Sequence, residues 1–167
     1  DTENASIKGD ITLPKNIQFG VTIGKKNYWT LSAEFAFSEW EKFALNSYDN
    51  ELKNSNKIMI GGSITPNIQA LGKENYWKSI QYNCGLKYGL SEVVYNNTQL
   101  PEYGINIGLS LPLRKFKYET ETFGSMINIG LGYMHRGDGD ASKINEDYIN
   151  LNLSITLNDK WFIKRKF

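Results

Sequence analysis

The sequence lacks several features by which common protein classes are identified. It contains one cysteine, Cys84, and one histidine, His135, among 167 residues. A single cysteine cannot form a disulfide within the chain, and a single histidine does not supply the ligand set of a catalytic metal. Lysine and arginine number 19 against 18 acidic residues, so no basic excess favours nucleic acid. No apolar run reaches the roughly 18 residues of a transmembrane helix.

Catalytic and ion-binding motifs are also missing. No GxSxG-type nucleophile element accompanies the single histidine, so we expect no enzymatic activity. The RGDGD stretch at residues 136–140 alternates aspartate with glycine, but the terminal glutamate of a calcium-binding loop is absent. The acidic residues of the 39–51 segment have no histidine or nucleophile near them in sequence, which is typical of a solvated loop. We therefore predict no catalytic residue, no metal and no cofactor.

What the sequence does contain is a strict alternation of apolar and polar residues. In residues 147–157, Ile149, Leu151 and Leu153 belong to an aliphatic series that alternates with amides and hydroxyls. Successive side chains of a β-strand point to opposite faces, so such a strand has one apolar and one polar face. The pattern recurs in seven segments, at residues 16–24, 29–37, 57–65, 76–89, 103–111, 123–135 and 147–157.

Alternating segments of about 9–11 residues have the length of tilted strands that cross a bilayer. We therefore predict an all-β fold, an antiparallel transmembrane β-barrel in the outer membrane of a Gram-negative bacterium. The shortest link, residues 24–27, and the longest, residues 38–56, fall on opposite sides, as periplasmic turns and outer loops do. The periplasmic links at 66–75 and 112–122 are longer than this rule expects. The one helix signal, SEWEKFAL at residues 38–45, lies in the longest link.

Seven strands do not close a bacterial single-chain barrel, which needs an even number of at least about eight. Residues 1–15 offer the run IKGDITLP as an eighth strand, but this run is short and contains Pro14. We favour a single barrel region, residues 1–167, that forms the C-terminal portion of a larger barrel and is incomplete at its N-terminus. Combination of several subunits into one barrel is the alternative.

Aromatic residues lie near the expected strand ends, where amphipathic rings suit the membrane interface. The residues predicted to lie at this interface are Trp29, Trp77, Trp161, Phe162 and Phe167. The last three also end the C-terminal strand, which we expect to act as a signal to the barrel-assembly machinery. Glu34 and Lys87 occur on the polar faces of their segments and are predicted to be charges facing the lumen.

Nearly all of the chain from Leu13 onward is covered by the stretches LPKNIQFGVTIGKKNYW, IGGSITPN, YWKSIQYNCGLKYG, PEYGINIGLSLPL, INIGLGYMHRG and NLNLSITLNDKWFIKRKF. These stretches resemble the C-terminal half of the FadL/OmpP-like hydrophobic-compound transporter superfamily, in its Bacteroidota branch. The resemblance implies a barrel of about fourteen strands, an even number as such barrels require, of which this chain holds about the last seven. The N-terminal hatch of that superfamily has no counterpart here, so no ligand residue is carried over.

The resemblance implies a non-enzymatic barrel that passes hydrophobic small molecules passively. The alternative is a structural or scaffold subunit of an outer-membrane secretion or assembly complex, whose wall and loops bind other proteins. The expected partners are outer-membrane lipid, the barrel-assembly machinery and other outer-membrane proteins. A soluble β-sandwich is a further alternative, but sandwich strands average about 5–6 residues, fewer than several segments have here.

Overall fold

The computed structural model describes residues 11–45, 51–68, 70, 73–118, 121–137 and 144–157, without the side chains at 73–74 and 114–124. Nine strands (β) and two short 3-10 helices (η) make up this part of the chain. In chain order they are β1 (Ile11–Thr12), β2 (Asn16–Lys25), β3 (Trp29–Ser38), η1 (Trp40–Lys42), β4 (Ala44–Leu45), β5 (Ser55–Ile64), η2 (Lys73–Ser79), β6 (Gln81–Tyr95), β7 (Thr98–Tyr118), β8 (Glu121–Arg136) and β9 (Glu146–Thr156). Over these residues, no helix has the length and hydropathy needed to cross a membrane.

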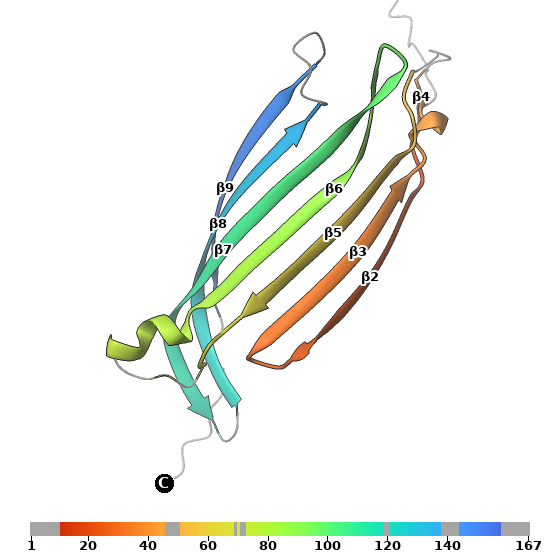
Figure 1. Cartoon of the computed structure of the whole chain (residues 1–167). Coiled ribbons are helices and arrows are strands. Elements are labelled where there is room, and N and C mark those ends of the chain that lie inside the picture. The colour runs from red at the N-terminus through yellow and green to blue at the C-terminus, as the bar shows by residue number, and fades with distance from the viewer. Residues whose placement is uncertain are drawn as a thin grey trace, which may run out of the picture.

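Seven of the strands form one antiparallel sheet in the order β2-β3-β5-β6-β7-β8-β9. Each strand pairs with the sheet strand that precedes it in the chain, so the sheet is a continuous meander. Figure 1 shows that it is curved, with β2 and β9 at its two margins. The predicted all-β antiparallel fold and its seven long strands are therefore confirmed. Closure into a barrel is not seen, because β2 and β9 each pair on one side only.

The pairing register places the apolar members of every strand on the same side. One row across the sheet consists of Ile23, Leu31, Gly62, Cys84, Ile107, Leu131 and Leu151. A shift of one residue in any pair would have moved that strand's aliphatic residues to the other side. We call the side of Ile107 the apolar face and the side of its neighbour Asn106 the polar face.

Within residues 1–15, the part described adds no eighth strand to the sheet, because β1 pairs with β4 instead. This agrees with our preference against an eighth strand there. Two local predictions are wrong. The helix expected at residues 38–45 is one 3-10 turn, η1, followed by β4. The fourth segment does not begin as a strand at Tyr76, since residues 73–79 form η2.

The long links expected at 89–102 and 112–122 are largely extensions of hairpins. Strand β7 has 21 residues and continues past Pro112, where the register shifts and a bulge accommodates a residue that cannot donate a backbone hydrogen bond. At the other end, Asn96 and Asn97 join β6 to β7 with φ of 47° and 64°. Two successive left-handed residues form the tight turn that suits a twisted hairpin.

The sheet has almost no core of its own. Among the described residues the buried hydrophobic side chains are Ile80 and Leu100, and each lies near an end of the sheet. The aliphatic residues of β9, in contrast, are between 63% and 77% exposed. A soluble sandwich would cover this surface with a second large sheet, whereas the other sheet among the described residues is the two-stranded pair of β1 and β4.

Candidate functional site: the two faces of the sheet

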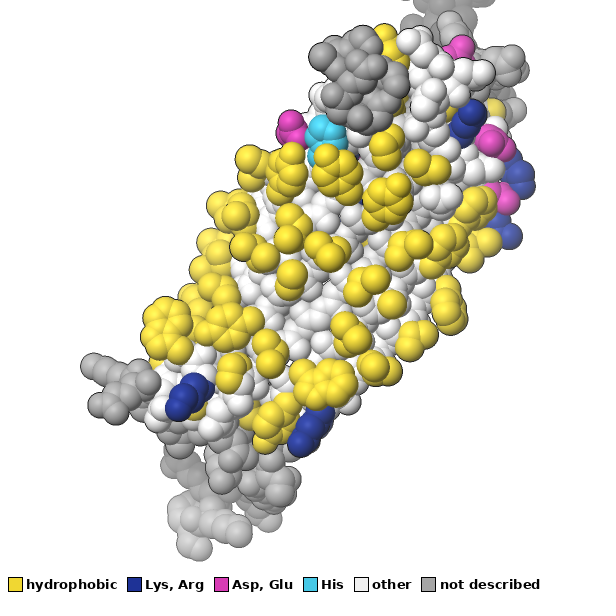
Figure 2. Space-filling view, in the orientation of Figure 1, with side chains coloured by type: hydrophobic (Ala, Val, Ile, Leu, Met, Phe, Trp, Pro, Cys, Tyr) yellow, Lys and Arg dark blue, Asp and Glu magenta, His cyan; other side chains and the backbone are white. Residues whose placement is uncertain are grey.

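The apolar face presents aliphatic side chains across all seven strands. Figure 2 shows them spread over the middle of the molecule, with charged side chains confined to its ends. Burying one such side chain is worth about 1.5–3 kcal/mol. The four aliphatic residues on this face of β9 alone therefore represent on the order of 10 kcal/mol of burial. So large an uncovered surface indicates contact with a membrane or another protein.

Aromatic residues occupy two levels of this face. Near one end, Phe19, Phe35, Tyr88 and Tyr103 lie in one register row with His135. Six residues further along the strands, on the same face, Trp29 and Tyr82 share another row. An aliphatic zone between two aromatic levels is the arrangement found on the lipid side of transmembrane barrels.

The five predicted interface aromatics fall into two groups. Trp29 starts β3 and is 43% exposed, while Trp77 lies in η2 and is 69% exposed. The Tyr82 hydroxyl, on the same row as Trp29, donates to the Trp77 carbonyl at 3.1 Å, so both tryptophans lie at one end of the sheet. Trp161, Phe162 and Phe167 are outside the described residues.

The polar face carries a buried carboxylate, Glu102, surrounded by three cations. Arg136 donates to its Oε1 from Nε at 2.9 Å and from Nη2 at 2.6 Å. The ammonium groups of Lys87 and Lys57 lie 3.0 and 3.2 Å from Oε2. Glu102 itself is fully buried. The four residues come from β5, β6, β7 and β8, so the cluster joins four adjacent strands.

The register explains how these charges meet. Lys57, Gly89, Glu102, Arg136 and Glu146 form one row across five strands. Gly89 leaves the gap in this row, because a Cβ there would lie 2.2 Å from the carbonyl oxygen of Asn56. Lys87 reaches Glu102 from the next row. A buried carboxylate is tolerated only when cations and hydrogen bonds compensate its lost hydration, and this row supplies both.

A second set of contacts lies near Glu102, at the same end of the sheet. The side-chain amide of Gln99 on β7 donates to the carbonyls of Asn54 and Ser91 at 2.7 and 2.6 Å. The backbone N–H of Lys53 donates to the carbonyl of Glu92 at 3.1 Å. These bonds fasten residues 53–54 to the β6–β7 hairpin, and Leu100 and Ser91 are buried there. The end of the sheet that carries Glu102 is thus fastened to the loop after η1.

Beyond this end, the described side chains of the polar face are neutral and mostly small. Hydroxyl pairs connect neighbouring strands, as in Thr22 with Ser32 and Thr30 with Ser63, both at 2.8 Å. Asn128 donates to Ser154 at 3.2 Å in the same manner. These hydrogen bonds give the hydroxyl and amide groups partners, and none of the groups is charged. The charged groups are therefore concentrated at one end of the polar face.

The two charges predicted to face a lumen, Glu34 and Lys87, both lie on the polar face. They share a register row but are separated by Met59 of β5. Glu34 accepts a hydrogen bond from Gln18, whereas Lys87 pairs with Glu102. The structure therefore places both on the expected face but does not pair them with each other.

Sequence reasoning missed the centre of this cluster, Glu102 and Arg136. Both lie at the margins of alternating segments and keep the parity of the polar positions, Glu102 with Asn106 and Arg136 with Asn128. Extending the alternation outward by one residue beyond each segment would have placed both on the polar face. Their direct contact depends on pairing between β7 and β8.

His135 lies on the opposite, apolar face. Its Nδ1 is 2.8 Å from Oδ1 of Asp147, which also accepts a hydrogen bond from the Tyr133 hydroxyl at 2.6 Å. The described residues hold no group of three potential metal ligands. Outside the sheet, the Lys42 ammonium donates to Glu39 at 2.7 Å and lowers the pKa of that carboxyl group.

Comparison with known proteins identifies a family for this chain. The family model described as BamG matches residues 1–167, the whole chain. No curated protein and no solved structure matches. These comparisons support a link to outer-membrane assembly and give no specific support to the FadL/OmpP-like transporter superfamily. Because the match extends over the entire sequence, the chain belongs to the BamG family.

Proposed function

We propose that this chain is the wall of an outer-membrane β-barrel that serves as a structural subunit of the Bam barrel-assembly machinery. The observation that carries the proposal is the whole-chain match to BamG, a family whose name associates it with that machinery. The scaffold alternative from the sequence therefore has more support than passive transport, which nothing in the comparisons favours.

The two faces of the sheet support the membrane part of this proposal. Aliphatic side chains on one face of all seven strands suit hydrocarbon, while hydroxyls, amides and one charge cluster suit the interior of a barrel. The free edges of β2 and β9 need hydrogen-bonding partners within a bilayer, since lipid offers none. We propose that further strands complete the barrel on both edges, to about fourteen in total, an even number as in other bacterial barrels.

The scaffold role is tested on the full-length protein in its native cells. We expect it to remain in the membrane after an alkaline wash and to copurify with the central barrel-assembly protein. A photo-crosslinking residue at Asn97, on the exposed turn between β6 and β7, tests for contact at that end. A second one at Ile107, in the middle of the apolar face, serves as the matched control.

Crosslinks from Asn97 to a barrel-assembly component, with only lipid adducts from Ile107, are the strongest support. Protein adducts from Ile107 to a barrel-assembly component would also support the subunit role and would place the contact on the wall. A protein that washes off the membrane, or one that purifies without any barrel-assembly component, contradicts the proposal.

A further inference from the structure

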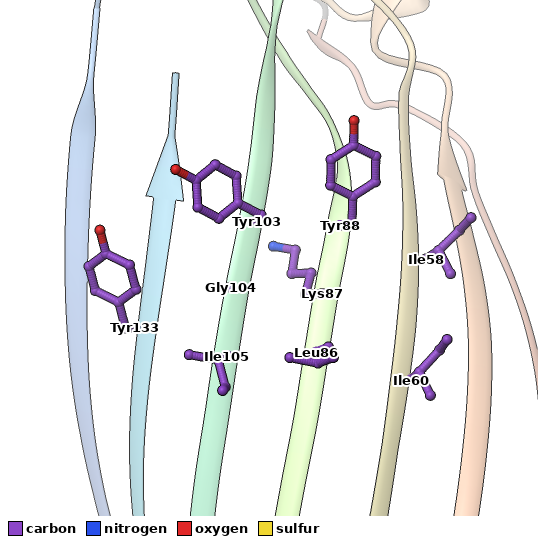
Figure 3. Close-up of a pocket in the computed structure, with 9 residues that line it drawn as sticks. All are labelled: Ile58, Ile60, Leu86, Lys87, Tyr88, Tyr103, Gly104, Ile105 and Tyr133. Atoms are coloured by element: carbon purple, nitrogen blue, oxygen red, sulfur yellow. The ribbon is translucent and has the colours of Figure 1, made fainter. Parts of the chain in front are cut away.

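A groove of about 520 Å³ crosses the apolar face over strands β5 to β8. Its floor consists of aliphatic side chains from one register row, including Ile60, Leu86 and Ile105. Tyr88 and Tyr103 line it in the next row toward the charged end of the sheet. The groove therefore has an apolar part and an aromatic part, arranged along the direction of the strands (Figure 3).

The groove is open because its two tyrosines lie apart. Tyr103 and Tyr88 are register partners, yet the ring of Tyr103 stacks on His135 of β8, with ring centroids 5.0 Å apart and 33° between the planes. His135 is held in turn by Asp147, which also accepts the Tyr133 hydroxyl. Figure 3 shows the ring of Tyr103 directed toward β8 and away from Tyr88. Hydrogen bonds thus fix one wall of the groove.

Polar groups at the aromatic end are available to a ligand. The hydroxyls of Tyr88 and Tyr103 have no hydrogen-bond partner among the described residues, and the Asp147 side chain is 61% exposed. Lys87 also lines the groove, but its ammonium is 3.0 Å from Glu102 on the polar face. The aromatic end thus offers hydroxyls, ring faces and a carboxylate.

We propose that this groove binds one zwitterionic lipid, with an acyl chain along Leu86 and Ile105 and an ammonium-bearing headgroup at Tyr103, Tyr133 and Asp147, the last of which lies beside the groove on β9. The inference rests on the proposed membrane location. An ammonium group is attracted by a carboxylate and by tyrosine rings, whereas a headgroup with only negative charge is repelled by Asp147. The aliphatic floor matches a hydrocarbon chain and continues into the surrounding apolar face.

The test uses the full-length protein purified in mild detergent and analysed by native mass spectrometry after addition of phosphatidylethanolamine or phosphatidylglycerol. Ile105→Trp fills the groove with apolar volume and keeps the face compatible with lipid. Ile107→Trp makes the same change one repeat further along β7, on the same face but outside the groove. Asp147→Asn removes the negative charge at the aromatic end.

We expect the wild type to retain one phosphatidylethanolamine with about tenfold preference over phosphatidylglycerol, a difference of about 1.4 kcal/mol. Ile105→Trp should lose this retention, Ile107→Trp should keep it, and Asp147→Asn should lose the headgroup preference. Equal retention by Ile105→Trp and the wild type overturns the inference, as does equal binding of both lipids by the wild type. Crosslinking of a protein from Leu86 in cells also overturns it.

Failure of this inference and failure of the proposed function give different results. If the protein enters the membrane and copurifies with the barrel-assembly machinery but retains no lipid selectively, only the lipid site is wrong. If the protein washes off the membrane, the proposed function is wrong and the lipid site is wrong with it.

Discussion

The apolar and polar faces are built from alternate residues of the same strands, yet they are stabilised in different ways. On the apolar face, Ile107 is exposed to the surroundings of the protein, and its neighbours in the row, Cys84 and Leu131, are apolar residues that make no specific polar contact with it. On the polar face, Glu102 has specific partners on three other strands. A substitution on the apolar face should therefore change stability only through the hydrophobicity of the new side chain. A substitution in the Glu102 cluster of the polar face should change stability through the specific ion pairs and hydrogen bonds that are lost.

The largest effect is expected from Glu102→Ala. Removal of one member of a buried ion cluster typically destabilises a protein by about 3–5 kcal/mol, because the remaining charges lose their compensation. Denaturant unfolding of the full-length protein in lipid vesicles measures this change. Glu34→Ala is the matched control on the same face, since Glu34 accepts one hydrogen bond from Gln18. Equal effects of the two variants would show that the cluster around Glu102 is not special.

A smaller effect is expected from a charge in the middle of the apolar face. Ile107→Arg should reduce the stability of the inserted barrel by about 2–4 kcal/mol, the range for arginine at the bilayer midplane. Asn106→Arg, one residue away on the polar face, should leave insertion nearly unchanged. The fraction of protein resistant to an alkaline wash measures both. If Asn106→Arg is the more damaging of the two, the assignment of the faces is reversed.

The contact between residues 53–54 and the β6–β7 hairpin is expected to contribute less. Gln99→Ala leaves the carbonyls of Asn54 and Ser91 without their donor, a loss of about 1–2 kcal/mol. Hydrogen exchange at the Lys53 amide, which donates to Glu92, should become faster. Gln81→Ala, also in a strand of this hairpin but at the other end of the sheet, should leave that exchange rate unchanged.

The smallest effect is expected from Lys42→Ala. Lys42 is exposed, so its pair with Glu39 is screened by water. The pKa of Glu39 should rise toward the ordinary value of glutamate when its hydrogen-bond donor is lost. Any stabilisation by this pair is present at neutral pH and is lost as the pH falls, and we expect it to be below detection in unfolding measurements. A clear loss of stability would assign this loop a structural role.

Much of the sheet could be predicted because alternation of apolar and polar residues indicates a strand with one face that is buried or in contact with lipid. Residues 16–24 and 29–37 correspond to β2 and β3 within one residue at each end. The prediction failed where strands extend beyond the apolar zone, as in β7 at Pro112, because a bulge that tolerates proline has no clear sequence signal. It also missed the pairing of β1, whose partner lies in a distant loop.

The candidate site was less predictable than the fold. The contacts of Glu102 join residues 57, 87, 102 and 136, and no local pattern connects positions so far apart. Lys87 and Glu34 were recognised as unusual because they interrupt runs of small polar residues. Their true partners depend on the register of four strand pairings, which the sequence specifies only through the folded sheet. The groove on the apolar face likewise depends on the stacking of Tyr103 on His135.

The position of Glu102 has a consequence for the way the sheet assembles. Its carboxylate acquires its full set of counter-ions only after β5, β6, β7 and β8 have all come into register. An intermediate in which only some of these strands have paired leaves the negative charge of Glu102 without all of its cations. The lysine and arginine side chains that have not reached Glu102 then lack their counter-ion. We therefore expect the correct pairing of these four strands to be cooperative at this end of the sheet. A hairpin with a shifted register loses the stabilisation of the ion cluster before the remaining strands have paired.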